Sequence, residues 1–210
     1  MTIKGIIFDM DGTLIDSQLD FDQMRLDMNL PENAPILETI ESYTGTRRQQ
    51  CNRVLRRHEQ IGVDKATVFP GIPEFIEYAD SLGLKMAIVT RNLHEFAVEM
   101  LKLLTVTFSP VIGREEGPIK PDPWALHQIC RTWGIQPHEA LMAGDYRFDL
   151  EAGKNAGCPT LWFSQNRVVG DSDWHQLADY TLKDNFQGKV LLDKILDDHS
   201  DFAKSPIEPD

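Results

Sequence analysis

The chain has 210 residues, of which 41% are hydrophobic and 26% are charged, and its formal net charge is −12. This length and balance are typical of a folded protein with one sizeable core and a small accessory unit. The negative charge argues against a general nucleic-acid binder, because nucleic-acid backbones attract clustered cations. A small anionic substrate remains compatible with it, since local charge can oppose the net charge.

The three cysteines, Cys51, Cys130 and Cys158, are odd in number and form no CxxC pair. They therefore argue against a disulfide framework and against a thiolate zinc site. The N-terminus lacks the pattern of a signal peptide, and the apolar stretch 6–8 is far too short to span a membrane. We expect a cytoplasmic protein that acts on a small molecule, binds no membrane, and is a monomer or a weak dimer.

The first predicted element is a buried strand over residues 3–8, which are apolar and β-branched. The next stretch, from about Leu14 to Phe69, shows helical patterns and no convincing strand. Pro31 and Pro35 interrupt the first of these helical patterns, and Gly45 and Gly62 bracket another.

After Pro70 and Gly71 the sequence alternates between helical and strand patterns. The predicted helices are 72–82, 93–104, 123–133, 148–156 and 190–196, and the predicted strands are 85–90, 110–113, 140–144 and 160–163. This alternation predicts an α/β fold with a mostly parallel sheet covered on both faces. We expect a core formed by residues 1–13 and 71–197, an inserted helical lid at 14–70, and a flexible tail at 198–210.

The first cluster of polar residues follows the first strand. Asp9 and Asp11 are two residues apart on an extended segment, so they point the same way. Gly12 lets the chain turn sharply before Thr13. Two close carboxylates need a cation or a shared proton, and one of them can attack phosphorus while the other moves protons. The alternative is that both simply shape a turn.

A second cluster, formed by Thr90, Arg91 and Asn92, follows the predicted strand 85–90. Asn92 and Glu95 have the spacing of a capping box, and a helix N-terminus with a neighbouring hydroxyl can bind an anion. Taken alone, these residues predict no more than a capped helix.

Two further clusters contain Lys120, Asp145 and Asp149. Lys120 lies in a loop stiffened by two prolines, with Asp122 placed to cap the next helix. Asp145 ends a strand, and Asp149 lies one helical turn later, where it can bind metal waters, fix the lysine or favour the helix start. Because ligands bind at the carboxyl ends of parallel strands, we expect these groups at one edge of the sheet. Asp145 and Asp9, with the backbone carbonyl of Asp11, would form an all-oxygen site suited to Mg²⁺.

This combination resembles the haloacid dehalogenase-like hydrolases with a helical cap, particularly their phosphoglycolate phosphatase-like members. The family motif DxDGT matches residues 9–13, and the family's Ser/Thr, lysine and acidic motifs match Thr90, Lys120, and Asp145 with Asp149. The resemblance spans about residues 3–163. It implies a Rossmann-like sheet with a small helical cap.

The resemblance also implies a role for each matching residue. Asp9 is the expected nucleophile and a metal ligand, and Asp11 the acid/base with its carbonyl on the metal. Asp145 is the expected third protein ligand of Mg²⁺, supported by Asp149. The expected phosphoryl and substrate contacts are Thr90, Lys120, Gly12, Thr13, Arg91 and Asn92.

Two features depart from the family pattern and weaken any inference about the substrate. Tyr146 follows the first acidic residue, where Ser or Thr is common, and the insertion is short for a phosphoglycolate phosphatase cap. The insertion also carries Arg47, Arg48, Arg53, Arg56 and Arg57 with no acidic residue between 47 and 57. These arginines either bind an anionic group of the substrate or form a solvated helix face.

Three other functions fit the same scaffold. A haloacid dehalogenase would not need Asp11 as an acid or the phosphate-binding residues. A phosphomutase would return the phosphoryl group to a sugar, which depends on how water is excluded. A non-catalytic module that binds phosphorylated metabolites would have no chemical reason to keep Asp9, Asp11, Lys120 and Asp145 together. Release of phosphate distinguishes a phosphatase from the others.

Overall fold

The computed structural model describes residues 2–165 and 173–201 and divides the chain into two compact units. One unit contains the chain up to Asp16 and from Val68 onward, and the other is the segment Ser17–Thr67. Two short strands, Ile15–Asp16 (β2) and Thr67–Val68 (β3), pair with each other where the chain passes between the units. They correct the prediction that residues 14–69 contain no strand, because two residues are too few to leave an alternating pattern.

A six-stranded parallel sheet forms the centre of the larger unit, in the order β5-β4-β1-β6-β7-β8. The strands are Val111–Ile112 (β5), Lys85–Val89 (β4), Gly5–Phe8 (β1), Ala140–Gly144 (β6), Thr160–Phe163 (β7) and Tyr180–Leu182 (β8). Helices connect most of the strands, as parallel strands require. The α/β class and the Rossmann-like core are therefore confirmed.

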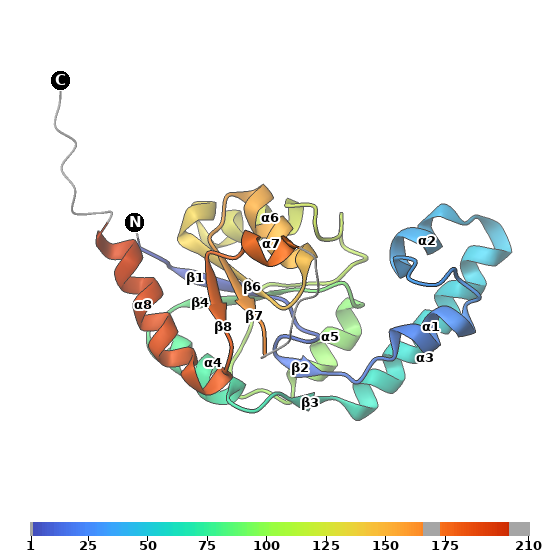
Figure 1. The fold of residues 1–210 in the computed structure, drawn as a ribbon, viewed down its shortest axis with the longest axis horizontal. Coiled ribbons are helices and arrows are strands. Elements are labelled where there is room, and N and C mark those ends of the chain that lie inside the picture. Colours follow the sequence, from blue (N-terminus) through green and yellow to red (C-terminus); the bar gives the residue numbers. More distant parts are fainter. Residues whose placement is uncertain (1, 166–172, 202–210) are drawn as a thin grey trace, which may run out of the picture. The chain divides into compact units, whose positions relative to one another are not determined.

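Helices cover both faces of this sheet (Figure 1). Trp124–Trp133 (α6) and Arg147–Ala156 (α7) pack together on one face, and Ile72–Ser81 (α4) and Gly188–Asp201 (α8) pack together on the other. His94–Leu101 (α5) packs beside β5. All four residues of β1 are buried because β1 lies between two other strands and under both helical layers. This burial explains the continuous apolar run at the start of the sequence.

The strand register brings three strand ends to one level. Phe8, the last residue of β1, pairs with Ile88 of β4 on one side and with Ala143 of β6 on the other. The polar residues that follow these strands, including Asp9 and Asp145, therefore emerge at the same edge of the sheet. This edge is formed by the carboxyl ends of the strands, where open parallel sheets bind ligands.

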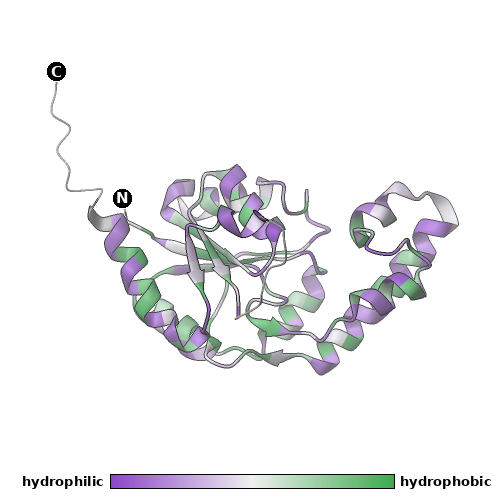
Figure 2. Cartoon of the chain, in the orientation of Figure 1, coloured by the Kyte–Doolittle hydropathy of each residue, from purple (hydrophilic) through white to green (hydrophobic). Residues whose placement is uncertain are grey.

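The end of the chain differs from the sequence prediction. α8 runs from Gly188 to Asp201, well beyond the predicted 190–196, so the expected tail begins inside this helix. The rest of that tail, residues 202–210, lies outside the described residues. Hydrophobic and hydrophilic residues alternate along α8 (Figure 2), and its Leu192 and Ile195 are fully buried. This pattern is typical of a helix that packs one face against a core.

The segment Ser17–Thr67 has a hydrophobic core of its own. Its helices are Phe21–Asp27 (α1), Ile36–Ser42 (α2) and Gly45–Lys65 (α3). The buried residues of its core are Met24, Met28, Ile36, Ile40, Cys51 and Leu55. The longest helix, α3, carries five arginines. No helix in the described part of the chain has the length and apolar character needed to cross a bilayer.

Three short 3₁₀ helices also lie in the described part of the larger unit. They are Pro137–Glu139 (η1), Asp173–Leu177 (η2) and Asn185–Gln187 (η3). η2 packs against α7, and η3 packs against α4 and α8. The first of these contacts lies beside the polar edge of the sheet, where the candidate site is found.

Candidate active site

Asp9 and Lys120 form a buried ion pair at the polar edge of the sheet. Asp9 is 7% exposed and Lys120 is 2% exposed. The Nζ of Lys120 lies 2.5 Å from Asp9 Oδ1 and 2.7 Å from Asp149 Oδ1, and it donates a hydrogen bond of 2.7 Å to the carbonyl of Val89. A buried ammonium requires such partners, because it has lost its water. The three acceptors therefore fix the lysine beside the candidate nucleophile.

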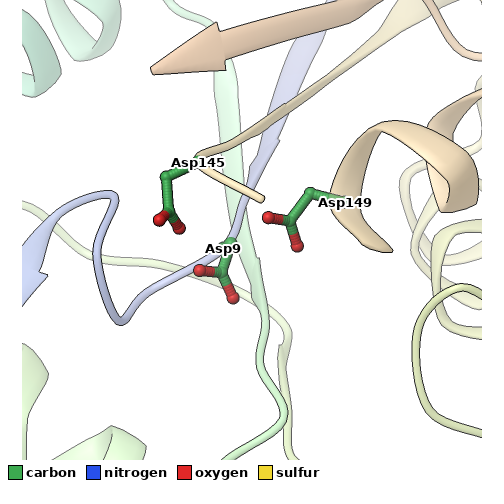
Figure 3. A group of neighbouring side chains, drawn as sticks. All are labelled: Asp9, Asp145 and Asp149. Carbon is green, nitrogen blue, oxygen red and sulfur yellow. The ribbon is translucent and has the colours of Figure 1, made fainter. Parts of the chain in front are cut away.

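Three carboxylates, those of Asp9, Asp145 and Asp149, meet at the same place and are called the acidic group below (Figure 3). Asp9 follows β1, Asp145 follows β6, and Asp149 lies in the first turn of α7. Each offers an oxygen within 4.8 Å of those of the other two. These three carboxylates and Lys120, which come from distant parts of the sequence, lie together as predicted.

Two glycines allow the carboxylates to come this close to the backbone. Gly12 has a φ of +84°, which favours glycine, and a Cβ built on it would lie 2.6 Å from Asp145 Oδ2. A Cβ on Gly144 would lie 2.3 Å from the Cβ of Asp149. A side chain at either position would displace a carboxylate, so the two glycines determine the geometry of the acidic group.

Thr13 holds two of the carboxylates. Its side chain is fully buried, and its Oγ1 lies 3.1 Å from Asp145 Oδ1 and 3.4 Å from Asp9 Oδ2. The structure thus gives Thr13 a positioning role in addition to the predicted contact with substrate. Asp11 is partly buried, and its Oδ2 accepts a hydrogen bond of 3.4 Å from Asn92 Nδ2.

The loop after β4 is folded on itself. Thr90 is 4% exposed, and its Oγ1 accepts a hydrogen bond from the amide of Asn92, whose Oδ1 in turn accepts one from the amide of Leu93. The predicted capping box at Asn92 is wrong, because α5 begins only at His94. The amide of His94 donates to the carboxylate of Glu115 instead. A partner 21 residues away along the chain leaves no local signal.

The side chain of Arg91 contacts the loop that carries Lys120. Its Nη1 donates a hydrogen bond of 2.6 Å to the carbonyl of Lys120, and its guanidinium lies 4.4 Å from the ring centroid of Phe148. The side chain therefore ties together the loops that carry Thr90 and Lys120. A direct contact with substrate stays a prediction for Arg91.

The electrostatics of Asp9 reflect its crowded surroundings. Burial raises the pKa of Asp9 well above its ordinary value, and the carboxylates of Asp149 and Asp145 raise it further. Lys120 opposes these effects by charge and by its hydrogen bond. Burial also lowers the pKa of Lys120, but Asp149 and Asp9 more than compensate, so this pKa lies above its ordinary value. The lysine is therefore charged, and its effect on the pKa of Asp9 is smaller than that of burial and the neighbouring carboxylates together.

The composition of the acidic group fits a divalent metal ion. Its three described members offer only carboxylate oxygens, which are the ligands of hard cations such as Mg²⁺, Ca²⁺ and Mn²⁺. Negative charge exceeds the charge of the single ammonium, so a bound cation would relieve the repulsion that raises the pKa of Asp9. Asp9, Asp145 and Asp149 would hold this ion or its waters.

Two residues of the site were missed by the sequence analysis. Trp162 donates from Nε1 to the carbonyl of Asp145 at 3.1 Å, and Gln165 donates from Nε2 to the carbonyl of Gly12 at 2.9 Å. Trp162 lies in β7, which neighbours β6, and Gln165 follows the end of this strand by two residues. The rule that ligands lie at strand ends would have pointed to this segment, but not to the particular side chains.

The arginines of α3 fall into different environments within their own unit. Arg47 donates hydrogen bonds to the carbonyls of Met28 and Asn29, and Arg57 pairs with Asp27 at 3.3 Å. A shallow cavity of about 330 Å³ lies on the same helix. It is lined by Gln50, Arg53, Val54 and Arg57. Arg53 and Arg57 thus share a face, as predicted from their spacing.

Comparison with known proteins gives a consistent result. A family model described as haloacid dehalogenase-like hydrolase matches residues 6–163. The chain is 34% identical to a haloacid dehalogenase-like hydrolase domain-containing protein of Arabidopsis thaliana, over 82% of this chain and 75% of that protein. It is 30% identical to a phosphoglycolate phosphatase of Aquifex aeolicus, over 94% of this chain and 98% of that protein.

The fold is also similar to that of solved structures. A predicted phosphoglycolate phosphatase from Haemophilus somnus superposes with a TM-score of 0.72 at 22% identity, covering 93% of this chain and 98% of the other. At this identity the similarity supports the fold alone. The family model and the two sequence relatives support the family.

Proposed function

Because this chain belongs to the haloacid dehalogenase-like hydrolases, we propose that it is a Mg²⁺-dependent phosphatase of a small phosphorylated metabolite, similar to phosphoglycolate phosphatases. One observation carries the proposal. The buried carboxylate of Asp9 lies in contact with the ammonium of Lys120 and within 4.8 Å of two further carboxylates. This arrangement supports Asp9 as the nucleophile, Lys120 as the cation for phosphoryl oxygens and the three carboxylates as metal ligands.

In the first step, a carboxylate oxygen of Asp9 attacks phosphorus. The new bond between this oxygen and phosphorus forms as the ester bond to the leaving group breaks. The bonding electrons go to the leaving oxygen, which takes a proton from Asp11. The products are the free alcohol, an aspartyl-phosphate on Asp9 and an ionised Asp11.

In the second step, Asp11 removes a proton from water while the water oxygen attacks phosphorus. The bond between phosphorus and the Asp9 oxygen breaks, its electrons return to the carboxylate, and inorganic phosphate leaves. Asp11 is protonated again, so both aspartates end as they began. The hydrogen bond from Asn92 to Asp11 would orient this acid during both steps.

The loops around Asp9 supply the groups that bind phosphoryl oxygens. Thr90 directly follows β4, and the loop between β5 and α6 holds the ammonium of Lys120 against Asp9. Charge-assisted hydrogen bonds from such groups would stabilise charge that develops during transfer. The turn at Gly12 and the segment Arg91–Asn92 would complete the cradle. Mg²⁺, when bound by the acidic group, would offset the negative charge of the phosphoryl oxygens.

The cysteines bear on where this activity takes place. The three cysteines are buried as free thiols, which is the state expected in a reducing cytoplasm. We propose that the protein acts there on a diffusing metabolite. A phosphomutase on the same scaffold, or a non-catalytic module that binds phosphorylated metabolites, remain the competing functions.

The test is phosphate release from a panel of phosphorylated metabolites that includes 2-phosphoglycolate and sugar phosphates. Wild type should release phosphate in the presence of Mg²⁺ and stop when a chelator is added. Asp9→Asn, which keeps the size of the side chain, should be inactive while remaining folded by circular dichroism. Transfer of phosphate to a second sugar position without its release would favour the mutase. Binding without release or transfer would favour the module.

A further inference from the structure

Four aromatic side chains, Tyr146, Phe148, Trp162 and Trp174, form a continuous aromatic wall beside the acidic site. The centroid of the Tyr146 ring lies 5.3 Å from that of Phe148 and 5.7 Å from that of Trp174. Trp174 in turn lies 5.5 Å from Trp162. These distances and the tilted or edge-on angles are those of favourable aromatic pairs. The wall is therefore a packed structure in which each ring fixes the next.

The aromatic wall is joined to the candidate metal ligands. Tyr146 directly follows Asp145, and its amide donates a hydrogen bond of 3.0 Å to Asp149 Oδ2. At the other end, Trp162 donates to the carbonyl of Asp145. The ring of Tyr146 is thus attached through its own backbone and its neighbours to two of the three carboxylates.

A second connection leads to the groups expected to bind phosphoryl oxygens. Phe148 is covered by the guanidinium of Arg91, which also donates to the carbonyl of Lys120. A cation on one face of Phe148 and the ring of Tyr146 against it leave Phe148 little freedom. The aromatic wall is therefore continuous with the loops that carry Thr90 and Lys120.

Within this wall, Tyr146 is the ring most open to a ligand. It is 50% exposed, whereas Trp162 is 8% exposed and Phe148 and Trp174 are partly buried. A rigidly held aromatic ring can bind a flat ligand with little loss of conformational entropy. This open ring directly follows Asp145, one candidate metal ligand, and its own backbone amide donates to Asp149, another.

We propose that Tyr146 is a specificity-determining residue that packs against a planar, apolar leaving group of the phosphate ester. This inference rests on the proposed phosphatase function and adds to it a preference, among the esters that the enzyme hydrolyses, for alcohols that carry an aryl or heteroaryl ring. The phosphoryl group binds at Asp9 and Lys120, and the ring of the alcohol stacks on or packs edge-on against Tyr146. Trp174 and Phe148 hold Tyr146 in position for this contact.

The experiment compares two esters with primary-alcohol leaving groups, 2-phenylethyl phosphate and n-butyl phosphate, with Mg²⁺ present. Wild type should prefer the phenylethyl ester in kcat/KM. Tyr146→Ser should reduce this preference by about tenfold, which is equivalent to about 1.4 kcal/mol and lies near the upper end of the range for aromatic contacts. Tyr146→Phe should keep it within about twofold because the ring remains. Phe186→Ser, which removes a 67% exposed ring from η3, is the matched control and should leave the preference unchanged.

If Tyr146→Ser lowers kcat/KM equally for both esters, or changes neither value, the preference is unchanged and the inference is overturned. Tyr146 would then stabilise the fold or have no role in recognition. A wild type that hydrolyses other phosphate esters without preferring the phenylethyl one would overturn it too, while the phosphatase function would stand. If no ester is hydrolysed, the phosphatase function fails. Calorimetric binding of 2-phenylethylphosphonate and n-butylphosphonate then still tests Tyr146, because the ratio of their Kd values should fall about tenfold in Tyr146→Ser and an unchanged ratio would exclude the contact.

Discussion

Lys120 shows how single residues shape this site. Its ammonium is buried among two carboxylates and a backbone carbonyl, and its own pKa is raised by the two carboxylates. Such a group is costly to bury, and the pairs it makes offset that cost without a large net gain. Its value lies in the fixed position of a positive charge beside Asp9.

Removing this ammonium should strongly destabilise the folded protein. In Lys120→Met two carboxylates lose their buried partner, so we expect the free energy of unfolding to fall by about 3–5 kcal/mol. Urea denaturation in the presence of chelator measures it. The double variant Lys120→Met with Asp149→Asn should regain part of the loss, because one uncompensated charge is gone. A fall of less than about 1 kcal/mol would show that water reaches the site and screens these charges.

Removing a carboxylate should have the opposite effect in the metal-free protein. Asp145 raises the pKa of Asp9, which means that the two carboxylates repel each other. Asp145→Asn keeps an oxygen for the Thr13 hydroxyl, so we expect the metal-free Tm to rise by about 2–4 °C, equivalent to about 1 kcal/mol. Differential scanning calorimetry with and without Mg²⁺ should also show that the Tm increase caused by the metal is lost. A lower metal-free Tm would mean that the carboxylate stabilises the loop more than it strains it.

The spacing of the motifs correctly placed Asp9, Lys120, Asp145 and Asp149 at one edge of a parallel sheet. That prediction works because strand ends in this fold share one edge, so chain position alone determines the neighbourhood. The spacing of the motifs does not predict the directions of the side chains. Thr13 bonding to two carboxylates and Arg91 turning toward the lysine loop depend on rotamers and on loops far away in the sequence.

At the scale of whole elements, the central strands and the helices α4, α6 and α7 lie within one or two residues of their predicted bounds. Their apolar runs and helix-ending glycines are strong local signals. The edge strand β8 was missed, because only three residues form it and one of them, Thr181, is exposed. An edge strand with one neighbour needs no continuous apolar run.

The carboxylate of Asp179 should stabilise the connection that leads into β8. It accepts hydrogen bonds from the amide and hydroxyl of Thr160 and pairs with Lys154 at 2.5 Å. Although burial raises its pKa, these partners outweigh burial and lower it. Since Asp179 is exposed, we expect Asp179→Ala to reduce the free energy of unfolding by only about 1–2 kcal/mol at neutral pH.

The pH dependence of this difference follows from the sign of the shift. A folded-state pKa below the unfolded one gives stability that is present above the unfolded pKa, near 3.8, and is lost as the pH falls through the folded one. The gap between wild type and Asp179→Ala should therefore shrink as urea titrations move from pH 7 to below about 4. Lys154→Ala removes one of the three partners and should show a smaller gap with the same trend. A gap that stays constant with pH would show that the hydrogen bonds do not depend on the charge.

At the scale of the whole molecule, the chain divides into two compact units. All three carboxylates of the acidic group and Lys120 belong to the unit built on the sheet, whereas the segment Ser17–Thr67 has a separate core. A separate core lets the insertion keep its own structure while the sheet fixes the three carboxylates and Lys120. We propose that this segment is the cap and that its contribution lies in substrate recognition.

The arginines of α3 provide a test of that proposal. Arg53 lines the shallow cavity together with Arg57, whereas Arg47 is used in hydrogen bonds to backbone carbonyls of its own unit. We expect Arg53→Ala to raise KM for 2-phosphoglycolate about tenfold with little change in kcat, since a charge-assisted hydrogen bond is worth about 1.5–3 kcal/mol. For ethyl phosphate, whose leaving group is neutral, KM should change less than about twofold.

Arg47→Ala is the matched control, because it removes the same side chain from the same helix at a position that serves the structure. It should lower Tm by a few degrees and change KM for both esters to the same extent, since the lost bonds hold Met28 and Asn29 and not a ligand. The ratio of the KM values for the two esters therefore distinguishes an effect on substrate recognition from an effect on folding. If Arg53→Ala weakens both esters equally, the arginines form a solvated face of the helix, and the specificity of the enzyme must come from the unit built on the sheet, where Tyr146 lies.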